Sequence, residues 1–299
     1  MTREEILDAV CLDVQILETT DKQYLYDKDF ILAAVKNHGY ALEYASKELQ
    51  ADKEVVLAAM NNFGSLEYAI TELQADKEVV LTAVEIFGWN LQFASQELQE
   101  DREVVLAAVK NFAWPLQDMP KVLQGDRDFV IEVVKSNGVM LECLNKELQA
   151  DREVVLAAVK NKGYALLYAS EELQADREVV LLAVDNNYDA YWDEVICALG
   201  CASKDLQADR EVVFKAVKNT AWSLLYASAE LQADREIVLT AVRSHGIALA
   251  DASAELRANK QIVLEAISQN PHALVYASEK IQEQLKVEYP SLLNIKDNI

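Results

Sequence analysis

Side chains that commonly carry chemistry are scarce in this 299-residue sequence, which has four cysteines and three histidines. So few cysteines in so long a chain do not make the dense disulfide framework of small secreted domains. The three histidines stand far apart, and no nucleotide-binding or zinc-protease signature accompanies them. The opening residues MTREEILDAV are charged where a secretory signal has its apolar core. We therefore expect a cytoplasmic protein that is not an enzyme and uses no cofactor.

Basic residues are also few, since 28 lysines and arginines face 50 acids and leave a net charge of −22. Nucleic acids and anionic membranes attract clustered basic side chains, so this balance argues against both as partners. No apolar run reaches the ~18–20 residues that span a bilayer. The composition favours a soluble chain whose partner is another protein, and a basic partner would complement its charge. No particular oligomeric state is predicted.

Repetition is what the sequence has in abundance. A 25-residue segment, most regular as DREVVLAAVKNKGYALLYASEELQA at 151–175, recurs eleven times. The copy at Asp52 has 24 residues and the copy at Asp176 has 33. A fixed period of this length is typical of stacked units that share no single globular centre. The copies begin at Thr2, Asp27, Asp52, Asp76, Asp101, Asp126, Asp151, Asp176, Asp209, Asp234 and Asn259.

Each copy predicts two helices joined by a turn. Numbering the copy from 1 to 25, position 1 is Asp, Asn or Thr, which cap helix N-termini, and position 3 is acidic in ten copies. Positions 4–9 read VVLAAV and glycine occupies position 13 in six copies, so we expect a helix of about ten residues with a glycine C-cap. Leucine at position 16 and Leu or Ile at position 23 predict a second helix from about position 14 to 24.

These helices predict an all-α fold, an α-solenoid of about eleven 25-residue helix-turn-helix repeats. The first helix is apolar over half its circumference, so it should be buried between neighbouring repeats. An isolated helix of about ten residues is barely stable in water, so stacking must stabilise it. We expect a single domain over 1–299, with a degenerate capping repeat at 2–26, ten repeats over 27–283 and a C-terminal cap or tail at 284–299.

The consensus D-[KR]-E-V-V-L-x-A-V-K-N-x-G-x-A-L-x-Y-A-S-x-E-L-Q-A resembles the repeat of an uncharacterised α-helical family labelled a domain of unknown function. The resemblance covers residues 2 to about 283 and is most specific in Asp52–Ala75 and Asp151–Ala175. It weakens in the first copy, at Trp114–Gly125 and at Asn187–Cys197. Members of that family occur in protists, large DNA viruses and intracellular bacteria, so the resemblance implies host-interacting or organelle-rich biology, and it brings no catalytic or ligand residues.

Two charged positions recur along the array. Position 2 is Lys or Arg in all eleven copies, and position 22 is acidic in eight. These charges either form salt links within or between repeats, or leave an acidic stripe for a basic partner. The position-22 acids are Glu48, Glu72, Glu97, Glu147, Glu172, Asp205, Glu230 and Glu255.

Aromatic side chains recur at positions 14 and 18, beside the predicted core of the second helix. Either they pack between neighbouring second helices, or they form a partly exposed groove flanked by carboxylates, and the two are compatible. We expect this aromatic–acidic face to bind the partner. Position 14 carries Tyr40, Trp89, Trp114, Tyr164 and Trp222, and position 18 carries Tyr44, Tyr68, Phe93, Tyr168, Tyr226 and Tyr276.

Two copies depart from the pattern where specificity could arise. Pro115 and Pro120 interrupt the copy at Asp101, which predicts a kink, a binding notch or neutral drift at 115–120. The insertion at 187–197 predicts either a contact loop or a helix extended by about two turns. It is the strongest single candidate for a specific site. Its candidate contact residues are Tyr188, Tyr191, Trp192, Asp193 and Glu194.

Chemistry that would indicate catalysis does not assemble. Cys197 and Cys201 share a helical face, but no histidine stands near them to complete a zinc site. His38, His245 and His272 fall at turns between helices, and most carboxylates belong to the recurring positions. The alternatives to a protein-binding scaffold are a structural subunit or spacer, a nucleic-acid mimic, and a small-ligand binder on the concave face.

Overall fold

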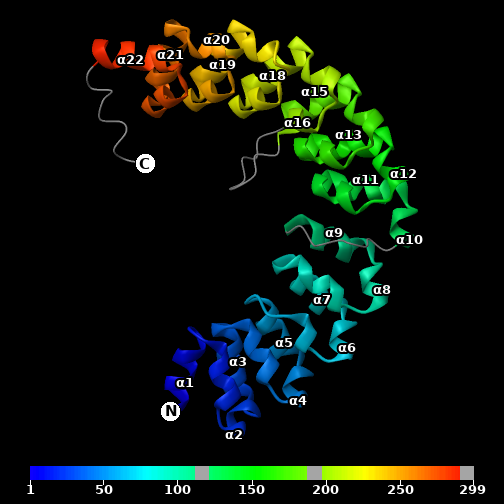
Figure 1. The fold of residues 1–299 in the computed structure, drawn as a ribbon. Helices are drawn as coiled ribbons and strands as arrows, with labels where there is room; N and C mark the ends of the chain where they lie inside the picture. Colours follow the sequence, from blue (N-terminus) through cyan, green and yellow to red (C-terminus); the bar gives the residue numbers. More distant parts are fainter. Residues whose placement is uncertain (112–120, 187–196, 290–299) are drawn as a thin grey trace. The chain divides into compact units, whose positions relative to one another are not determined.

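A computed structural model describes residues 1–111, 121–186 and 197–289, and in these ranges the chain forms helices without any strand. Figure 1 shows one set of helices recurring along the chain. The predicted all-α repeat fold is therefore confirmed. The chain divides into two compact units, Met1–Cys143 and Leu144–Ile299.

Every repeat begins with an α-helix that its first residue caps. The Asp151 carboxylate accepts the N–H groups of Glu153 and Val154 at 2.9 and 3.2 Å, two donors that the helix itself leaves open. Most of these helices span ten residues, as expected. In the first unit they are α1 (Arg3–Val10), α3 (Lys28–Asn37), α5 (Lys53–Met60), α7 (Lys77–Ile86), α9 (Arg102–Asn111) and α11 (Arg127–Ser136). In the second unit they are α13 (Arg152–Asn161), α15 (Arg177–Asp185), α18 (Arg210–Asn219), α19 (Arg235–Ser244) and α21 (Lys260–Gln269).

In every repeat whose second half the structure describes, that half is divided, so the continuous helix predicted from position 14 to 24 is wrong there. A 3₁₀-helix ends at position 18, and one α-helical turn follows at positions 21–24. Between them the backbone is extended, with ψ of 152° at Ala45 and 157° at Ser46. The Ser46 hydroxyl accepts the N–H of Leu49 at 3.4 Å and so caps the new turn. Serine favours this capping conformation over a helix interior, so it suits the break, although the same break occurs at Ile70, which has no capping side chain.

The shorter elements keep this order with three variations. In the repeat at Asp176 the α-helical turn α16 (Ala198–Cys201) replaces the 3₁₀-helix, and in the repeat at Asp209 the 3₁₀-turn η8 (Leu231–Ala233) replaces the final turn. The last repeat ends in the longer helix α22 (Glu279–Glu288). The 3₁₀-helices are η1 (Val14–Thr19), η2 (Gly39–Tyr44), η3 (Leu66–Tyr68), η4 (Gly88–Phe93), η5 (Gly138–Cys143), η6 (Gly163–Tyr168), η7 (Ala221–Tyr226), η9 (Gly246–Asp251) and η10 (Pro271–Tyr276). The one-turn helices are α2 (Lys22–Leu25), α4 (Lys47–Gln50), α6 (Thr71–Gln74), α8 (Gln96–Gln99), α10 (Lys121–Gln124), α12 (Lys146–Gln149), α14 (Glu171–Gln174), α17 (Lys204–Gln207) and α20 (Ala254–Arg257).

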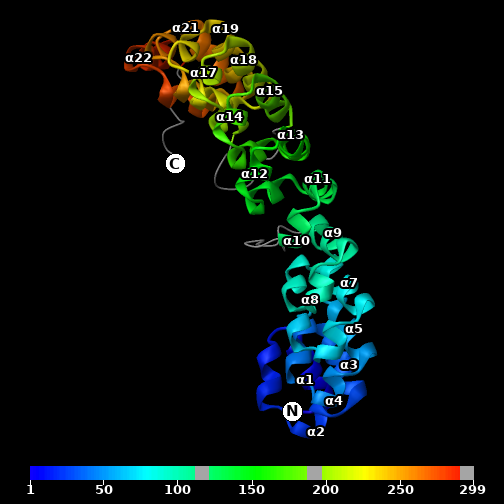
Figure 2. The same cartoon turned by 90° about the vertical axis from the view of Figure 1, so that its right-hand side faces the viewer.

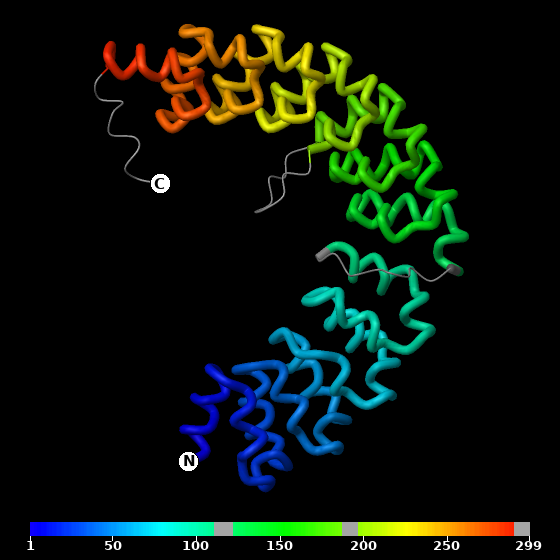
Figure 3. Tube along the Cα trace, in the orientation of Figure 1, coloured from blue at the N-terminus to red at the C-terminus, as the bar shows by residue number. Residues whose placement is uncertain are grey.

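Within each unit the repeats stack in chain order. The long helices form one row, as the labels α3, α5, α7, α9 and α11 show in Figure 2, and Figure 3 traces the same order along the Cα tube. The 3₁₀-helices form a second row that contacts the long helices. Neighbouring repeats are also joined through the main chain, because the N–H at position 20 donates to the carbonyl at position 24 of the preceding repeat. Ser95 donates to Gln74 in this way at 2.9 Å, and Ser253 donates to Gln232 at 2.9 Å.

The core lies between the two rows. In α3 it takes Phe30, Ile31, Ala34 and Val35, which are fully buried at positions 4, 5, 8 and 9, as the apolar arc predicts. Leu42 at position 16 is fully buried from the other row. Burying a large apolar side chain contributes roughly 1.5–3 kcal/mol. Because a lone ten-residue helix is marginal, this packing holds the repeats together.

The glycine at position 13 is not the predicted helix C-cap. No described glycine has a positive φ, and the residue that ends α3, His38, is extended at φ −154°. A Cβ added to Gly39 would lie 2.5 Å from the carbonyl oxygen of Ala59, and one added to Gly246 would lie 2.2 Å from that of Ala266. Glycine is needed because the backbone closely approaches the next long helix.

The 24-residue repeat absorbs its missing residue at the end of α5. This helix stops at Met60, and Phe63 then adopts φ 58°. No other non-glycine residue in the described ranges has a positive φ. The Gly64 N–H returns to the Ala59 carbonyl at 2.9 Å and closes the helix end. The Phe63 side chain is 66% exposed, so burial does not explain its conformation.

Candidate partner-binding face

The recurring aromatic side chains lie where position 14 of one repeat meets position 18 of the next. The rings of Tyr40 and Tyr68 pack edge to face, with centroids 6.2 Å apart and planes at 68°. Tyr44, Tyr68 and Phe93 are half-buried, whereas Tyr40 and Trp89 expose 36% and 41% of their surface. The rings therefore pack between repeats and still leave part of their surface open.

The second unit repeats this arrangement with different neighbours. Trp222 at position 14 lies 6.1 Å from the ring of His245 in the next repeat. The ring of Tyr226 lies against the backbone of Gly200, where an added Cβ would come within 2.7 Å of the ring. The half-buried rings of this unit include Tyr164, Tyr168, Trp222 and Tyr226.

Carboxylates at position 17 face these rings in the first unit. The carboxylate of Glu43, which belongs to the preceding repeat, acts on the Tyr68 hydroxyl. Burial of the ring, followed by the charges of Glu43 and Glu67, raises the pKa of Tyr68 to about 12. The phenol therefore stays a neutral hydrogen-bond donor at neutral pH. Acids at position 17 therefore act on the rings here, and that this face binds a partner stays a prediction.

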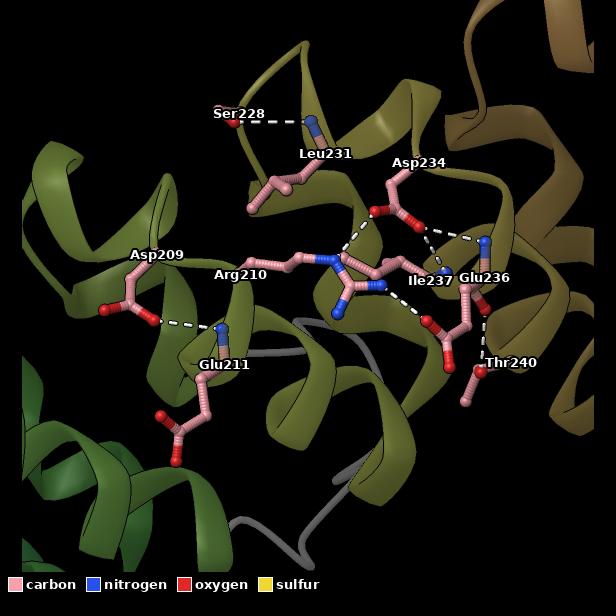
Figure 4. Close-up of polar contacts among 9 residues, drawn as sticks. All are labelled: Asp209, Arg210, Glu211, Ser228, Leu231, Asp234, Glu236, Ile237 and Thr240. Atoms are coloured by element: carbon pink, nitrogen blue, oxygen red, sulfur yellow. Dashed lines mark hydrogen bonds and ion pairs between the residues drawn. The ribbon is translucent and has the colours of Figure 1, made fainter.

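Position 2 forms an ion-pair ladder between repeats, which Figure 4 shows at Arg210. The Nε of Arg210 lies 2.9 Å from the Asp234 carboxylate, and its Nη2 lies 2.5 Å from that of Glu236. Asp234 also caps α19 by accepting the N–H groups of Glu236 and Ile237 at 2.9 and 3.1 Å. One carboxylate thus caps its own helix and holds the preceding repeat.

The same pairing recurs in both units. The hydrogen bond from Lys28 lowers the pKa of Asp52, while hydrogen bonds to Asp52 and Glu54 raise the pKa of Lys28. These side chains remain partly exposed, so each pair contributes little to stability. The ladder joins the basic residue at position 2 of one repeat to the acids at positions 1 and 3 of the next. The acids at position 22 take no part in it. Its further rungs join Lys53 to Asp76 and Glu78, Lys77 to Asp101 and Glu103, Arg152 to Asp176 and Glu178, and Arg177 to Asp209 and Glu211.

The position-22 acids are all exposed, and they lie on the one-turn helices except for Glu230, which precedes η8. Within the described ranges none of these eight carboxylates forms an ion pair. The pKa of Glu48 is lowered by its own backbone N–H and then by the Ser46 hydroxyl, and Glu172 is held in the same way with Ser170. These acids therefore stay exposed and outside the ion-pair ladder.

Glutamine at position 24 is a structural residue that the sequence reasoning missed. The Gln50 side chain is 4% exposed, and its Nε2 donates to the carbonyls of Leu42 and Glu43 at 3.0 and 3.1 Å. Lys47 in turn donates to Gln50 Oε1 at 2.8 Å. The glutamine closes the open end of the 3₁₀-helix and holds the one-turn helix against it. Its recurrence in nine of eleven copies was the available signal.

The cysteines and histidines do not converge. Cys197 is buried with its thiol 3.0 Å from the Ser223 hydroxyl, and burial raises the pKa of Cys201 to about 11. His38 lies beside Tyr40, with its ring 5.9 Å away. Across the described part of the chain, no group of three His, Cys, Asp or Glu side chains could hold a metal ion, and no helix could cross a bilayer.

Several predicted site residues fall outside the described ranges. The predicted kink at 115–120 lies there, and of the insertion at 187–197 only Cys197 is described. Whether these segments contact a partner stays a prediction. The contact residues concerned are Tyr188, Tyr191, Trp192, Asp193 and Glu194.

Stacked helical repeats, joined by an ion-pair ladder and lined by aromatic rings, define an all-α repeat protein. A comparison with family models identifies the family, and the chain belongs to the Domain of unknown function (DUF4116) family. Neither the curated proteins nor the solved structures gave a match. The family model matches residues 27–74, 76–124, 101–149, 126–174, 151–193, 176–232 and 234–282.

Proposed function

We propose that this protein is a cytoplasmic, non-catalytic scaffold that binds another protein along its aromatic–acidic face. The observation that carries the proposal is the edge-to-face pair of Tyr40 and Tyr68 beside Glu43. Half-exposed aromatic rings concentrate binding energy in protein interfaces, and nearby carboxylates favour basic partners. The exposed position-22 acids extend this chemistry along the array.

Two further observations support binding over catalysis. The cationic side chains of the ladder are already occupied by carboxylates of the next repeat, so few remain to attract a nucleic acid or an anionic substrate. Burial raises the pKa of Cys197 and Cys201, which makes these thiols poor nucleophiles at neutral pH. All four cysteines are free thiols, which supports a reducing compartment.

Affinity purification with paired variants tests the proposal. Trp89→Ala and Trp222→Ala remove one ring from each unit, and Lys110→Ala and Lys218→Ala are matched controls at exposed sites on α9 and α18. We expect the ring variants to lose the proteins that the wild type and the controls retain from cells of the source organism. Circular dichroism should show equal helix content. Identical sets of bound proteins for all variants would exclude this face as the interface.

The insertion needs its own test. If Tyr191 and Trp192 set specificity, replacing both with alanine should abolish capture of the partner while leaving the helix content unchanged. Capture that survives this change but is lost with the ring variants would assign recognition to the described face alone. Loss of assembly only when many ladder charges are replaced would instead favour a structural spacer.

A further inference from the structure

Position 17 changes character between the two units. In the first unit it carries acids or glutamine, whereas in the second it carries apolar side chains or glycine. The residues of the first unit are Glu18, Glu43, Glu67, Gln92 and Glu142 where the position is described, and those of the second are Leu167, Gly200, Leu225, Ala250 and Val275. The difference follows the division between units and is not scattered among repeats.

The backbone at position 17 is held in the same way in both units, so the difference lies in the side chains. Gln50 Nε2 donates to the Glu43 carbonyl at 3.1 Å, and Gln232 Nε2 donates to the Leu225 carbonyl at 3.2 Å. Gln174 makes the equivalent bond to Leu167 at 3.2 Å. An acid is therefore compatible with this backbone, and the fold does not require leucine there.

The large apolar side chains at this position are open to solvent. Leu167 exposes 44% of its surface, Leu225 exposes 55% and Val275 exposes 41%. Burying exposed apolar surface against a partner stabilises the complex by roughly 25 cal/mol per Å². A continuous patch of such surface therefore marks an interaction site.

Continuity comes from the small residues that alternate with these large ones. Gly200 leaves room for the ring of Tyr226 from the next repeat, where a Cβ would be only 2.7 Å away. The elements that carry the stripe, η6, α16, η7, η9 and η10, contact one another in succession. We call Leu167, Leu225 and Val275, with the rings of Tyr226 and Tyr276, the apolar stripe.

Acids border the apolar stripe. Gln174, Gln232 and Gln282 at position 24 each donate to the position-17 carbonyl of their own repeat, so the turn that carries positions 21 and 22 is held beside position 17. None of the acids there forms an ion pair within the described part of the second unit, whereas Lys146 and Lys204 each donate to a position-24 glutamine. The exposed acids are Glu147, Glu171, Glu172, Asp205, Glu230, Glu255 and Glu279.

We propose that the apolar stripe of the second unit docks a basic segment of a partner protein through apolar side chains of that segment. The acids at positions 21 and 22 receive its lysines and arginines, while leucine and valine at position 17 cover its apolar groups. The first unit, with acids or glutamine at position 17, keeps its aromatic rings and its charge but has no exposed leucine or valine at this position. This inference rests on the proposed scaffold function and assigns the two units different parts in it.

The test measures binding of two labelled synthetic peptides, of equal length and charge, to the full-length protein by fluorescence anisotropy. One peptide combines lysine with leucine, and the other combines lysine with serine. We expect the lysine–leucine peptide to bind more tightly and to keep binding at about 0.5 M NaCl, where charge attraction is screened. Equal affinities for the two peptides would overturn the inference.

Charge attraction and apolar docking predict opposite effects on peptide affinity when an acid replaces leucine at position 17. The double variant Leu167→Glu/Leu225→Glu adds negative charge, so charge attraction alone predicts tighter binding. Apolar docking predicts instead a loss of about tenfold for the lysine–leucine peptide, as expected when interface anchors are removed. Gln92→Glu adds a charge at the same position in the first unit and should not weaken binding of the lysine–leucine peptide. Leu225→Ser with unchanged helix content should weaken the same peptide without any new charge.

The outcomes separate this inference from the scaffold function. If Trp89→Ala and Trp222→Ala lose the cellular partner but Leu167→Glu/Leu225→Glu keeps both that partner and the peptide, the scaffold stands and the stripe assignment falls. If the wild type forms a dimer by ultracentrifugation that Leu225→Glu abolishes, the stripe belongs to a second copy of this chain and the inference is overturned.

Discussion

Phe63 adopts a backbone conformation that ordinarily selects glycine. At φ 58° its Cβ is crowded by the main chain, which costs of order 1–3 kcal/mol for a residue other than glycine. The ring is mostly exposed, so little burial offsets this cost. The strain follows from the residue missing in the repeat at Asp52, because the helix must end two residues early and still rejoin the stacking pattern.

Replacing Phe63 with glycine should therefore stabilise the protein. We expect Phe63→Gly to raise the free energy of unfolding by about 0.5–1 kcal/mol, after the larger entropy loss of glycine is deducted. Urea unfolding followed by circular dichroism measures the change. Phe63→Ala removes the ring but keeps most of the backbone strain, so its free energy of unfolding should rise less than that of Phe63→Gly. A destabilised glycine variant would show that contacts of the ring outweigh the strain.

Asp251 is a second residue whose environment opposes its charge. It occupies position 18, where six repeats carry an aromatic ring, and burial raises its pKa above the usual value of 3.8. A carboxyl whose pKa is raised in the folded state destabilises the protein when ionised. This cost is present at neutral pH and disappears as the pH falls below the pKa of the unfolded chain.

Asp251→Asn should consequently be more stable than the wild type at pH 7. The gain should shrink as the pH falls and vanish below about pH 4, because both proteins are then neutral at this position. Thermal melting at a series of pH values tests this. A gain independent of pH would assign the effect to packing of the amide and not to charge.

Among elements, the one-turn helix depends most on a single side chain. The amide of Gln50 is buried and donates to the carbonyls of Leu42 and Glu43 at the end of η2, where the Leu42 carbonyl also accepts the N–H of Ala45. Gln50→Leu keeps a side chain of similar size but removes the amide donor from both carbonyls, so we expect the free energy of unfolding to fall by about 1–3 kcal/mol. Gln96→Leu, on an exposed site of α8, is the control. Equal urea midpoints for the two variants would contradict this role.

The long helices were predictable because their signals are local. Asp151 precedes an apolar run with helical spacing, and both the cap and the buried face follow from neighbours in sequence. The division of the second half was not predictable, since Leu42, Ala45 and Leu49 have a spacing that also suits one continuous helix. A main-chain bond at position 20 to the preceding repeat separates the two parts, and no periodicity reports such a bond.

The candidate face was predictable in part for the same reason. Aromatic side chains such as Tyr40 and Tyr68 stand out in the sequence, and their spacing identified the positions that meet between repeats. The role of Gln50 was hidden because its partners are carbonyl groups, which every residue has. The contrast between Glu43 and Leu225 is visible in the sequence, yet only the exposure of both sites gives it meaning.

For the molecule as a whole, net charge should matter more than the ladder. A charge of −22 makes the folded chain repel itself, whereas the ladder pairs are partly exposed and weak. Salt screens both over roughly 10 Å at 0.1 M. We expect raising NaCl from about 0.02 to 0.5 M to increase the melting temperature by a few degrees, with the same result in KCl. A lower melting temperature at high salt would show that the ladder dominates.

The main-chain bonds between repeats have a consequence for how such an array can change. In the 24-residue repeat the position-20 residue is Ile70 instead of serine, yet its N–H still reaches Gln50 at 3.3 Å. In the 33-residue repeat Ser203 still reaches Gln174 at 2.9 Å, although the extra residues precede it. This main-chain hydrogen bond between repeats is therefore kept when the side chain at position 20 changes and when the length of the repeat changes. Foreign loops grafted into the turn between positions 11 and 15 should therefore leave the register of the neighbouring repeats intact, which makes this turn the natural place to graft new specificity.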